Sequence, residues 1–200
     1  MTQPWIRVTR WGLAVTMLGA MLGTAAVGAQ AEGWYTSVPL GYTITWDADS
    51  WQSNRLETTE TSDILSLSDD NSAVVFIGRN DGSDAQDAVE NFGKSLEDDS
   101  RLADVELMED CPEGARALPS VTACYTYLRP GDGELVAETA LLEAWDLGDG
   151  VRLLMVATVA DTLFASYLPK WASFDILPAS ESATPVATPL AINRSFAGAA

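Results

Sequence analysis

The stretch ELVAETALLEAWDLGDGVRLLMVATV, residues 134–159, decides the fold. It contains two apolar runs, 134–146 and 151–159, which are separated by the turn Gly148-Asp149-Gly150. Strands joined by so short a link have to run antiparallel, because a parallel crossover needs roughly a dozen residues or more. The second run is apolar on both faces, which predicts a central strand that is covered on both sides.

More strands are predicted on the N-terminal side of this hairpin. Two segments with strand character directly precede it, and the turn Pro130-Gly131-Asp132-Gly133 connects the second of them to the hairpin. Farther upstream, a segment in which large apolar residues alternate with Thr is followed by two more apolar segments. Trp51, in the turn-like stretch 47–53, is expected to pack into the core. In chain order, the strands predicted before the hairpin are 42–46, 64–67, 73–77, 104–109 and 121–128.

Two helices are predicted. The first covers 84–97, where Ser83 and Gln86 have the spacing of a capping box and acidic residues occupy the first turn. Its apolar residues recur at helical spacing and form one stripe that faces a sheet, comprising Ala85, Ala88, Val89, Phe92 and Leu96. The second helix is expected to begin near Asp161 and to be kinked or split by Pro169.

Strands in a run, two helices and short turns together predict an α+β fold. We expect a mostly antiparallel sheet with helices over its faces. A single domain is predicted at 32–177. It follows a leader at 1–31 and precedes a flexible tail at 178–200, which is rich in Ala, Ser, Thr and Pro.

The leader has the composition of a secretory signal peptide. Residues 1–31 contain Arg7 and Arg10 but no acidic residue, and an apolar run follows from Trp11 to about Val27. The small-residue site Ala29-Gln30-Ala31 then precedes Glu32. An uncleaved anchor is the weaker alternative, because the run is shorter than the ~20 residues that a membrane span needs. We therefore expect an exported protein of bacterial type, secreted or in the cell envelope, without stable membrane insertion after cleavage.

The cysteine content fits the same compartment. Cys111 and Cys124 are the only two cysteines, and in an oxidising compartment such a pair is expected to form a disulfide. Two buried free thiols are the alternative. A zinc site is not indicated, because two thiols without a histidine supply half of the usual ligand set.

The overall composition excludes several functions. The 200 residues include 29 Asp and Glu, 11 Lys and Arg and no His, for a formal net charge of −18. A chain this acidic has too few Lys and Arg side chains to neutralise nucleic-acid phosphates. No nucleic-acid partner is therefore expected. Without histidine the chain cannot form a Ser-His-Asp triad, a Cys-His dyad or a histidine metal site.

With no histidine in the chain, pairs of Asp and Glu carboxylates are the side chains that could act as general acid and general base. The pairs nominated by the sequence are Glu143 with Asp146 and Glu134 with Glu138. Two carboxyl groups about 5–10 Å apart in a cleft would suit glycosidase-type hydrolysis. Among 29 acids such pairs also arise by chance, so the sequence assigns no catalytic residue.

Two kinds of weak binding site are also considered. Asn80-Asp81-Gly82-Ser83-Asp84 resembles part of a calcium loop, but it lacks the register and closing Glu of an EF-hand. A turn that leads into a capped helix explains the same residues, and the pairs Asp69-Asp70 and Asp98-Asp99 are expected to be solvated turns.

The tryptophans Trp34, Trp46 and Trp51 could form a sugar-binding platform if they were exposed. Packing of these side chains in the core is the stronger expectation. No metal or cofactor is assigned.

The order of these segments is similar to that of a known family. Ser37-Val38-Pro39-Leu40-Gly41-Tyr42-Thr43-Ile44-Thr45-Trp46, then a turn and Ser50-Trp51, resembles the opening of the PsbP-like α/β/α sandwich family. The closing helix with Trp171-Ala172-Ser173-Phe174 is also similar, and the resemblance covers about residues 34–177. It implies a fold whose members are mostly binding or assembly modules without a catalytic centre. The acidity and the cysteine pair depart from the family, so the resemblance implies no particular partner.

These observations lead to one main functional hypothesis. The chain is expected to be an exported, non-enzymatic, acidic domain that binds or supports an unidentified extracytoplasmic protein or ligand. The alternatives are a small carboxylate-dependent hydrolase and a weak calcium- or carbohydrate-binding module.

Overall fold

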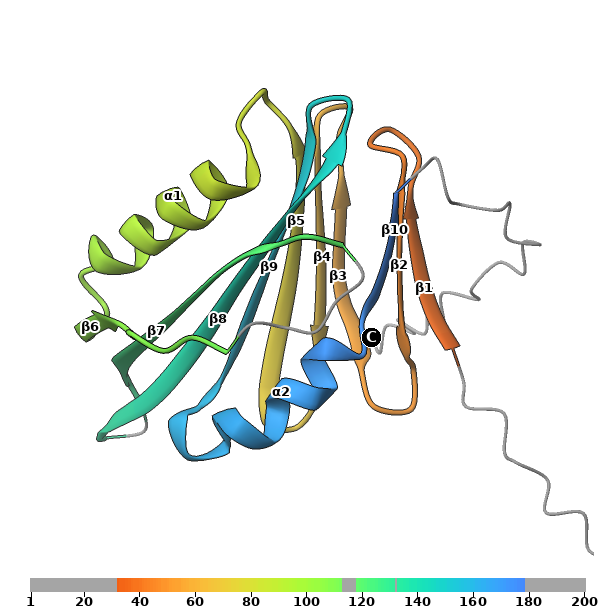
Figure 1. The fold of residues 1–200 in the computed structure, drawn as a ribbon. Helices are drawn as coiled ribbons and strands as arrows, with labels where there is room; N and C mark the ends of the chain where they lie inside the picture. Colours follow the sequence, from red (N-terminus) through yellow and green to blue (C-terminus); the bar gives the residue numbers. More distant parts are fainter. Residues whose placement is uncertain (1–31, 113–117, 132, 179–200) are drawn as a thin grey trace, which may run out of the picture.

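The computed structural model describes residues 32–112, 118–131 and 133–178 (Figure 1). In chain order its elements are β1 (Glu32–Ser37), β2 (Tyr42–Asp47), β3 (Gln52–Thr58), β4 (Ser62–Ser68), β5 (Ser72–Asn80), α1 (Ala85–Glu97), β6 (Ala103–Leu107), β7 (Val121–Pro130), β8 (Leu135–Gly148), β9 (Val151–Ala160), the 3-10 turn η1 (Asp161–Leu163), α2 (Phe164–Ala172) and β10 (Asp175–Pro178).

The described strands form two antiparallel sheets. Seven strands make the larger sheet in the order β3-β4-β5-β9-β8-β7-β6, and three make the smaller one in the order β1-β2-β10. In Figure 1 the smaller sheet lies to the right of the larger one, and α2 lies at the bottom. The α+β class and the mostly antiparallel sheet are confirmed, but the second sheet was not predicted.

The β8–β9 hairpin at the centre of the large sheet follows from its turn residues. Asp149 and Gly150 connect the strands, and both have positive φ angles, 53° and 75°. A two-residue loop with positive φ at both positions matches the right-handed twist of the flanking strands, which is why Asp-Gly is favoured there. The register runs from Glu138 opposite Ala160 to Gly148 opposite Val151.

Helix α1 packs against one face of the large sheet, which we call the outer face. Its buried side chains meet apolar side chains of β7, β8 and β9 in one cluster, made up of Ala85, Ala88, Val89, Tyr125, Leu142, Ala144, Leu154 and Val156. Gly93 lets the helix approach the sheet closely, because a Cβ at this position would overlap the ring of Tyr125.

Helix α1 begins one residue later than predicted. The N-cap is Asp84, which forms the capping box with Asp87, and not Ser83 with Gln86.

The opposite face, the inner face, carries the larger core. The small sheet and α2 contribute aromatic side chains to it, and Trp51 is buried as predicted. The rings of Trp51 and Phe76 both contact Phe174, with centroids 5.2 and 5.1 Å from the Phe174 centroid. Both β5 and β9 have a strand on either side in the large sheet, so they are central strands, as their apolar runs predicted. β9 is buried on both faces, whereas the outer face of β5 has Ala73 exposed and Val75 half-buried.

Several elements differ from the prediction. Strands β1 and β3 occupy stretches where no strand was predicted, and β10 lies at the end of the predicted domain, where it pairs with β2. Helix α2 continues through Pro169 as one helix, so the expected split does not occur. The predicted leader at 1–31 and the tail from 179 onward lie outside the described residues.

Candidate functional site

The structure does not bring Glu143 and Asp146 together. Both lie on β8, but residues three apart in a strand point to opposite faces. Glu143 points to the inner face, between Leu141 and Trp145. Asp146 lies on the outer face, where its carboxylate accepts a 2.8 Å hydrogen bond from the backbone N–H of Ala85 at the start of α1. This carboxylate therefore helps to cap a helix, which removes the pair as a candidate for acid–base catalysis.

Glu143 is nevertheless an unusual residue, because its exposed fraction is only 1%. Ser120 donates a 2.9 Å hydrogen bond to one of its carboxylate oxygens. Ser120 directly precedes β7, the strand that carries Cys124 of the disulfide. Glu143 thus fastens the segment before β7 to the inner face of the sheet. Buried carboxylates held by hydrogen bonds commonly have this structural role.

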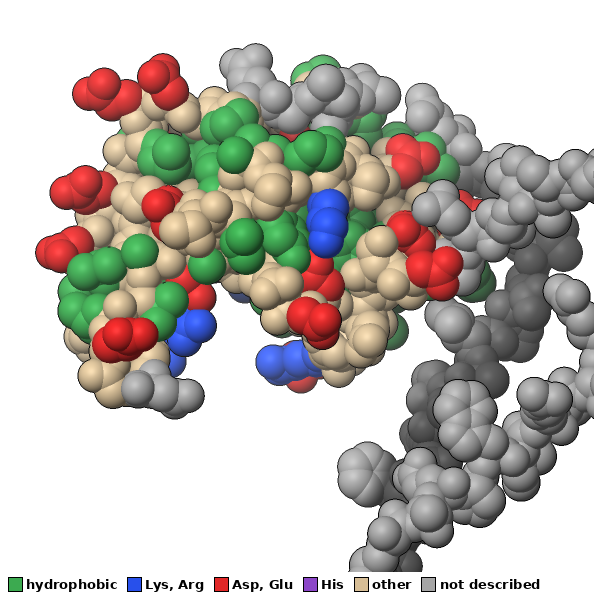
Figure 2. All heavy atoms as spheres, turned by 90° about the horizontal axis from the view of Figure 1, so that it is seen from below, with side chains coloured by type: hydrophobic (Ala, Val, Ile, Leu, Met, Phe, Trp, Pro, Cys, Tyr) green, Lys and Arg blue, Asp and Glu red, His purple; other side chains and the backbone are tan. Residues whose placement is uncertain are grey.

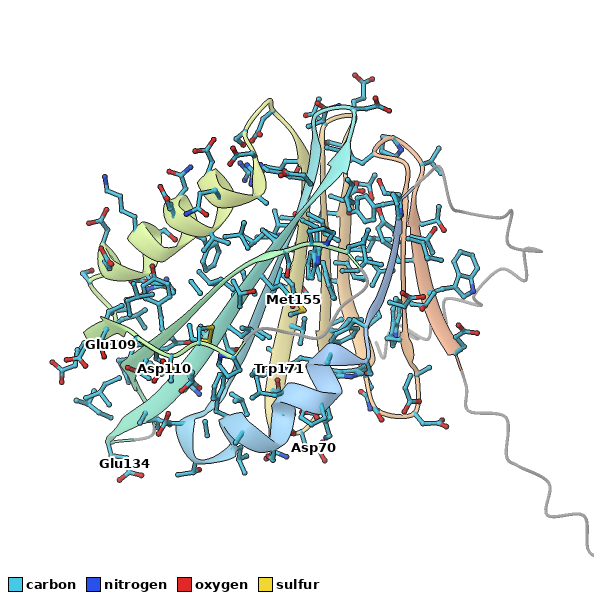
Figure 3. All side chains as sticks on the ribbon, viewed as in Figure 1. Asp70, Glu109, Asp110, Glu134, Met155 and Trp171 are labelled. Carbon is cyan, nitrogen blue, oxygen red and sulfur yellow. A yellow bond between two sulfur atoms is a disulfide. The ribbon has the colours of Figure 1, made fainter. Side chains whose placement is uncertain are left out.

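The second nominated pair is also separated. Glu138 lies on β8 and binds Arg129 of β7, with a distance of 2.6 Å between Nε and the carboxylate oxygen. Glu134 lies in the turn before β8 and is exposed. Figure 3 shows Glu134 pointing away from the molecule, as do Glu109, Asp110 and Asp70. In the view from below, acidic side chains are scattered over the middle and the edge of the face (Figure 2).

The loop that resembled part of a calcium loop, residues 80–84, is held in place by an arginine side chain. The guanidinium of Arg152, on β9, donates hydrogen bonds of 3.2 and 2.8 Å to the two carboxylate oxygens of Asp81. Ser83 also donates to Asp81, and Asp84 is occupied as the N-cap of α1. The hydrogen bonds from Arg152 hold the pKa of the Asp81 carboxyl well below its ordinary value. In the described part of the chain, no group of three or more acidic or cysteine side chains could hold a metal ion.

Asp81→Asn is expected to lower the free energy of unfolding by about 1–2 kcal/mol at pH 7. The loss arises mainly at Arg152, whose side chain is 9% exposed and would lose its carboxylate partner. The Asp81 side chain is 41% exposed, and solvent screening keeps the effect modest. Because folding lowers the pKa of Asp81, its contribution is complete above the unfolded pKa of about 4 and disappears as the pH falls through the lower folded value. Urea unfolding of both proteins between pH 7 and pH 2 measures this difference.

Asp99→Asn is the matched control. Asp99 also accepts two hydrogen bonds from an arginine, Arg101, which lowers its pKa to about 2. The Arg101 side chain is 84% exposed, so removal of its partner leaves no buried charge. We expect a smaller loss of stability for this variant than for Asp81→Asn. An equal loss in both variants would contradict the role assigned to the burial of Arg152.

Asp69 corrects the prediction of a solvated turn. Its carboxylate accepts hydrogen bonds from Tyr167 (2.8 Å) and Lys170 (3.2 Å) of α2, and from the backbone N–H groups of Asn71 and Ser72. The hydrogen bonds outweigh partial burial and lower the pKa of Asp69. This residue therefore connects the β4–β5 turn to α2.

The tryptophans do not form an exposed platform. Trp46 and Trp51 are buried in the inner core, and Trp34 on β1 is half-buried. The core-packing expectation is confirmed for Trp46 and Trp51. Since a sugar ring stacks on an accessible aromatic face, neither of these two can offer one.

The predicted disulfide between Cys111 and Cys124 is present, with a Cα–Cα distance of 5.2 Å. The Cys124 side chain is fully buried in the inner core, and Cys111 packs at its edge. Within the described residues, no helix is long and apolar enough to cross a membrane.

Sequence reasoning missed a polar connection between the two sheets. Asp63, on β4, is fully buried, and Tyr42 of β2 donates a 3.3 Å hydrogen bond to one of its carboxylate oxygens. Burial, together with the charge of Asp63, raises the pKa of the Tyr42 hydroxyl. Beside it, the hydroxyls of Tyr35 on β1 and Thr58 on β3 lie 3.1 Å apart. The alternation of Asp63 with Leu65 and Leu67 is the signal that could have placed it on a buried face.

An uncharged strip of the outer face is the feature best suited to binding. We call Ile64, Ser66 and Ser68 of β4, with Ala73 and Val75 of β5, the open strip. The apolar cluster beneath α1 extends only to Ile77 on β5, and the strip lies beyond it. Ala73 is exposed and the other four residues are half-buried. The register places Ser66 opposite Val75 and Ser68 opposite Ala73, so the five side chains share one face.

The absence of charge in the open strip is notable in a chain with 29 acidic residues. Charged residues are depleted at the centre of protein interfaces, because their desolvation is costly. Partly exposed aliphatic side chains on the sheet surface supply the apolar area that a partner can bury. This strip, and not a cluster of acids, is the candidate functional site.

Comparisons with known proteins identify no family for this chain. No family model matches it, and no curated protein matches it at a significant level. One of the solved structures that it resembles is LpqN of Mycobacterium tuberculosis, described as involved in cell envelope biogenesis. The match has 10% sequence identity and a TM-score of 0.39, and it covers 76% of this chain and 88% of LpqN. A similarity at this level does not establish a shared family or function, and the PsbP-like resemblance is not shown.

Proposed function

We propose that this protein is an exported, non-enzymatic binding or assembly module that holds an extracytoplasmic partner on its open strip. The observation that carries the proposal is the uncharged, partly exposed surface of Ile64, Ser66, Ser68, Ala73 and Val75 in a strongly acidic chain. The export part rests on the signal-peptide pattern of residues 1–31 and on the disulfide.

The arrangement of the carboxylates supports a role without catalysis. Glu143 and Asp146 point to opposite faces, and Asp146 accepts a hydrogen bond from the start of α1. Asp81 and Asp69 bind cationic side chains of neighbouring elements. Each of these acids is engaged in holding the fold together, whereas general acid–base catalysis needs two carboxyl groups that face the same substrate.

A photo-crosslinking experiment tests the binding role. A photoreactive amino acid is placed at Ala73 in the open strip, and at Glu106 on β6 as an equally exposed control. Each purified protein is irradiated with the envelope fraction and culture medium of its own host. We expect a discrete crosslinked species from position 73, which excess unlabelled protein suppresses, and none from position 106.

Ser66→Asp provides the second part of the test. A carboxylate in the middle of the strip would have to be desolvated on binding, so the crosslinked species should decrease at least tenfold. Thermal unfolding of the variant checks that the fold is retained. Undiminished crosslinking in Ser66→Asp, or equal crosslinking from both positions, would rule out the strip as the binding surface. Turnover of a glycoside or ester that Glu143→Gln abolishes and Ser66→Asp leaves intact would instead support the carboxylate hydrolase.

A further inference from the structure

Strand β3 is an accessible edge of the seven-stranded sheet. Among the described residues β4 is the only strand whose backbone pairs with it, and all seven of its residues are exposed. Tyr35 of β1 touches its end through the Thr58 side chain. Leu56 lies at its centre with an exposed fraction of 53%, opposite the buried Leu65 of β4. An edge strand presents backbone N–H and C=O groups that another strand can pair with.

The charges on this edge are complementary to those of a second copy. Arg55 and Glu57 flank Leu56 on the outer face, and they form an exposed ion pair with a distance of 2.6 Å between Nη2 and Oε1. Antiparallel pairing about a two-fold axis at Leu56 would place Arg55 of each copy opposite Glu57 of the other. Opposite charges directly across an antiparallel pair stabilise it, and like charges destabilise it.

The other edge of the same sheet has the opposite character. On β6, Asp104 and Glu106 flank Val105, so the same two-fold pairing would set acids against acids. The register shifts once on each edge strand, between Ala103 and Glu106 on β6 and between Ser53 and Arg55 on β3. The two edges therefore differ mainly in their charges, and like charges are one of the usual devices that prevent edge pairing.

The net charge restricts where two copies can meet. Each chain has a formal charge of −18, so two molecules repel one another over most of their surfaces. On β3, the charges of Arg55 and Glu57 on either side of Leu56 sum to zero, so the repulsion between two copies is locally cancelled at this edge. We propose that two copies of this chain form a dimer through antiparallel pairing of β3 with β3, with Leu56 at the two-fold axis.

Such a dimer would enlarge the binding surface. Because the side chains of Arg55 and Glu57 share the outer face with the open strip, the two strips would lie on one continuous sheet surface. The dimer does not depend on the proposed binding role, since its test uses purified protein alone.

A charge-swap series tests the dimer. Sedimentation velocity of the purified protein is measured from about 1 to 200 µM at ~0.15 M salt, a range suited to a weak interface. The wild type is expected to show a concentration-dependent monomer–dimer equilibrium. Arg55→Glu puts acid opposite acid, and Glu57→Arg puts cation opposite cation, so each should raise the dissociation constant at least tenfold. The double variant R55E/E57R restores opposite charges across the axis and should restore the dimer.

Glu97→Arg, at the exposed C-terminal end of α1, is the matched control, because it makes the same charge change as Glu57→Arg outside both edge strands, and it should leave the dissociation constant unchanged. Thermal unfolding of each variant distinguishes lost pairing from a lost fold. A wild type that stays monomeric to the highest concentration would overturn the proposal. A dimer that survives both single reversals, or that R55E/E57R fails to restore, would also overturn it.

Discussion

Trp171→Ala is expected to lower the free energy of unfolding by about 3–5 kcal/mol, because it empties the space between α2 and the inner face of the large sheet. Trp171 is fully buried, and its ring lies 5.9 Å from those of both Phe164 and Tyr167. Figure 3 shows it in the interior, as it does Met155 of β9. Its ring N–H donates a 3.2 Å hydrogen bond to Ser72, which in turn donates to the carbonyl of Thr158.

This network explains why the effect should be large. The alanine variant loses the ring volume and the hydrogen bond from α2 to β5 together, and the surrounding structure relaxes only partly into the cavity. Trp171→Phe keeps most of the volume and loses only the N–H donor, so its loss should be clearly smaller. Equilibrium unfolding in urea measures both variants, with Trp34→Ala, at a half-buried position, as the control. A loss for Trp171→Ala below that of Trp34→Ala would contradict the assigned role.

Removal of the disulfide in the double variant C111S/C124S is expected to lower stability by about 2–5 kcal/mol. The bridge joins residues 13 apart in sequence, and closure of a loop of that size restricts the unfolded chain by about 3 kcal/mol. Cys124 is fully buried in the inner core, so its serine replacement also leaves a polar group among apolar side chains. Urea unfolding of the variant is compared with that of the wild type.

Chemical reduction provides the control for the disulfide. Wild type treated with a thiol reductant should lose nearly as much stability as the double variant, and the reductant should not affect the variant further. The native protein should contain no thiol that alkylates under denaturing, non-reducing conditions. Two alkylated cysteines in that assay would contradict the bridge.

The central hairpin, helix α1 and the disulfide could be predicted from the sequence because local chemistry specifies them. Asp149-Gly150 allows the positive φ angles of a tight hairpin, and the long apolar runs on either side can only be buried strands. The apolar stripe of α1 repeats with helical periodicity. Two cysteines in one small domain leave a single possible pairing within the chain. The residue that caps α1 was missed by one position, because Ser83 and Asp84 both have capping side chains.

The elements that were missed depend on distant partners. Strand β3 has no buried residue and no alternation of apolar and polar side chains, and it is a strand because β4 offers an edge for pairing. Strand β10 has four residues and completes the small sheet only because α2 returns the chain to β2.

The candidate site was beyond the reach of sequence reasoning for the same reason. The sequence by itself determined the α+β class, the central strands, α1 and the disulfide, because turn residues, periodicity and cysteine count are properties of short stretches. Tertiary structure alone decided that Glu143 and Asp146 face opposite sides and that Asp81 binds Arg152. It also decided that α1 leaves the open strip of β4 and β5 uncovered. Which side chains meet, and which faces stay uncovered, depends on how strands far apart in the chain pair and which element packs on them, and no short stretch of sequence records that.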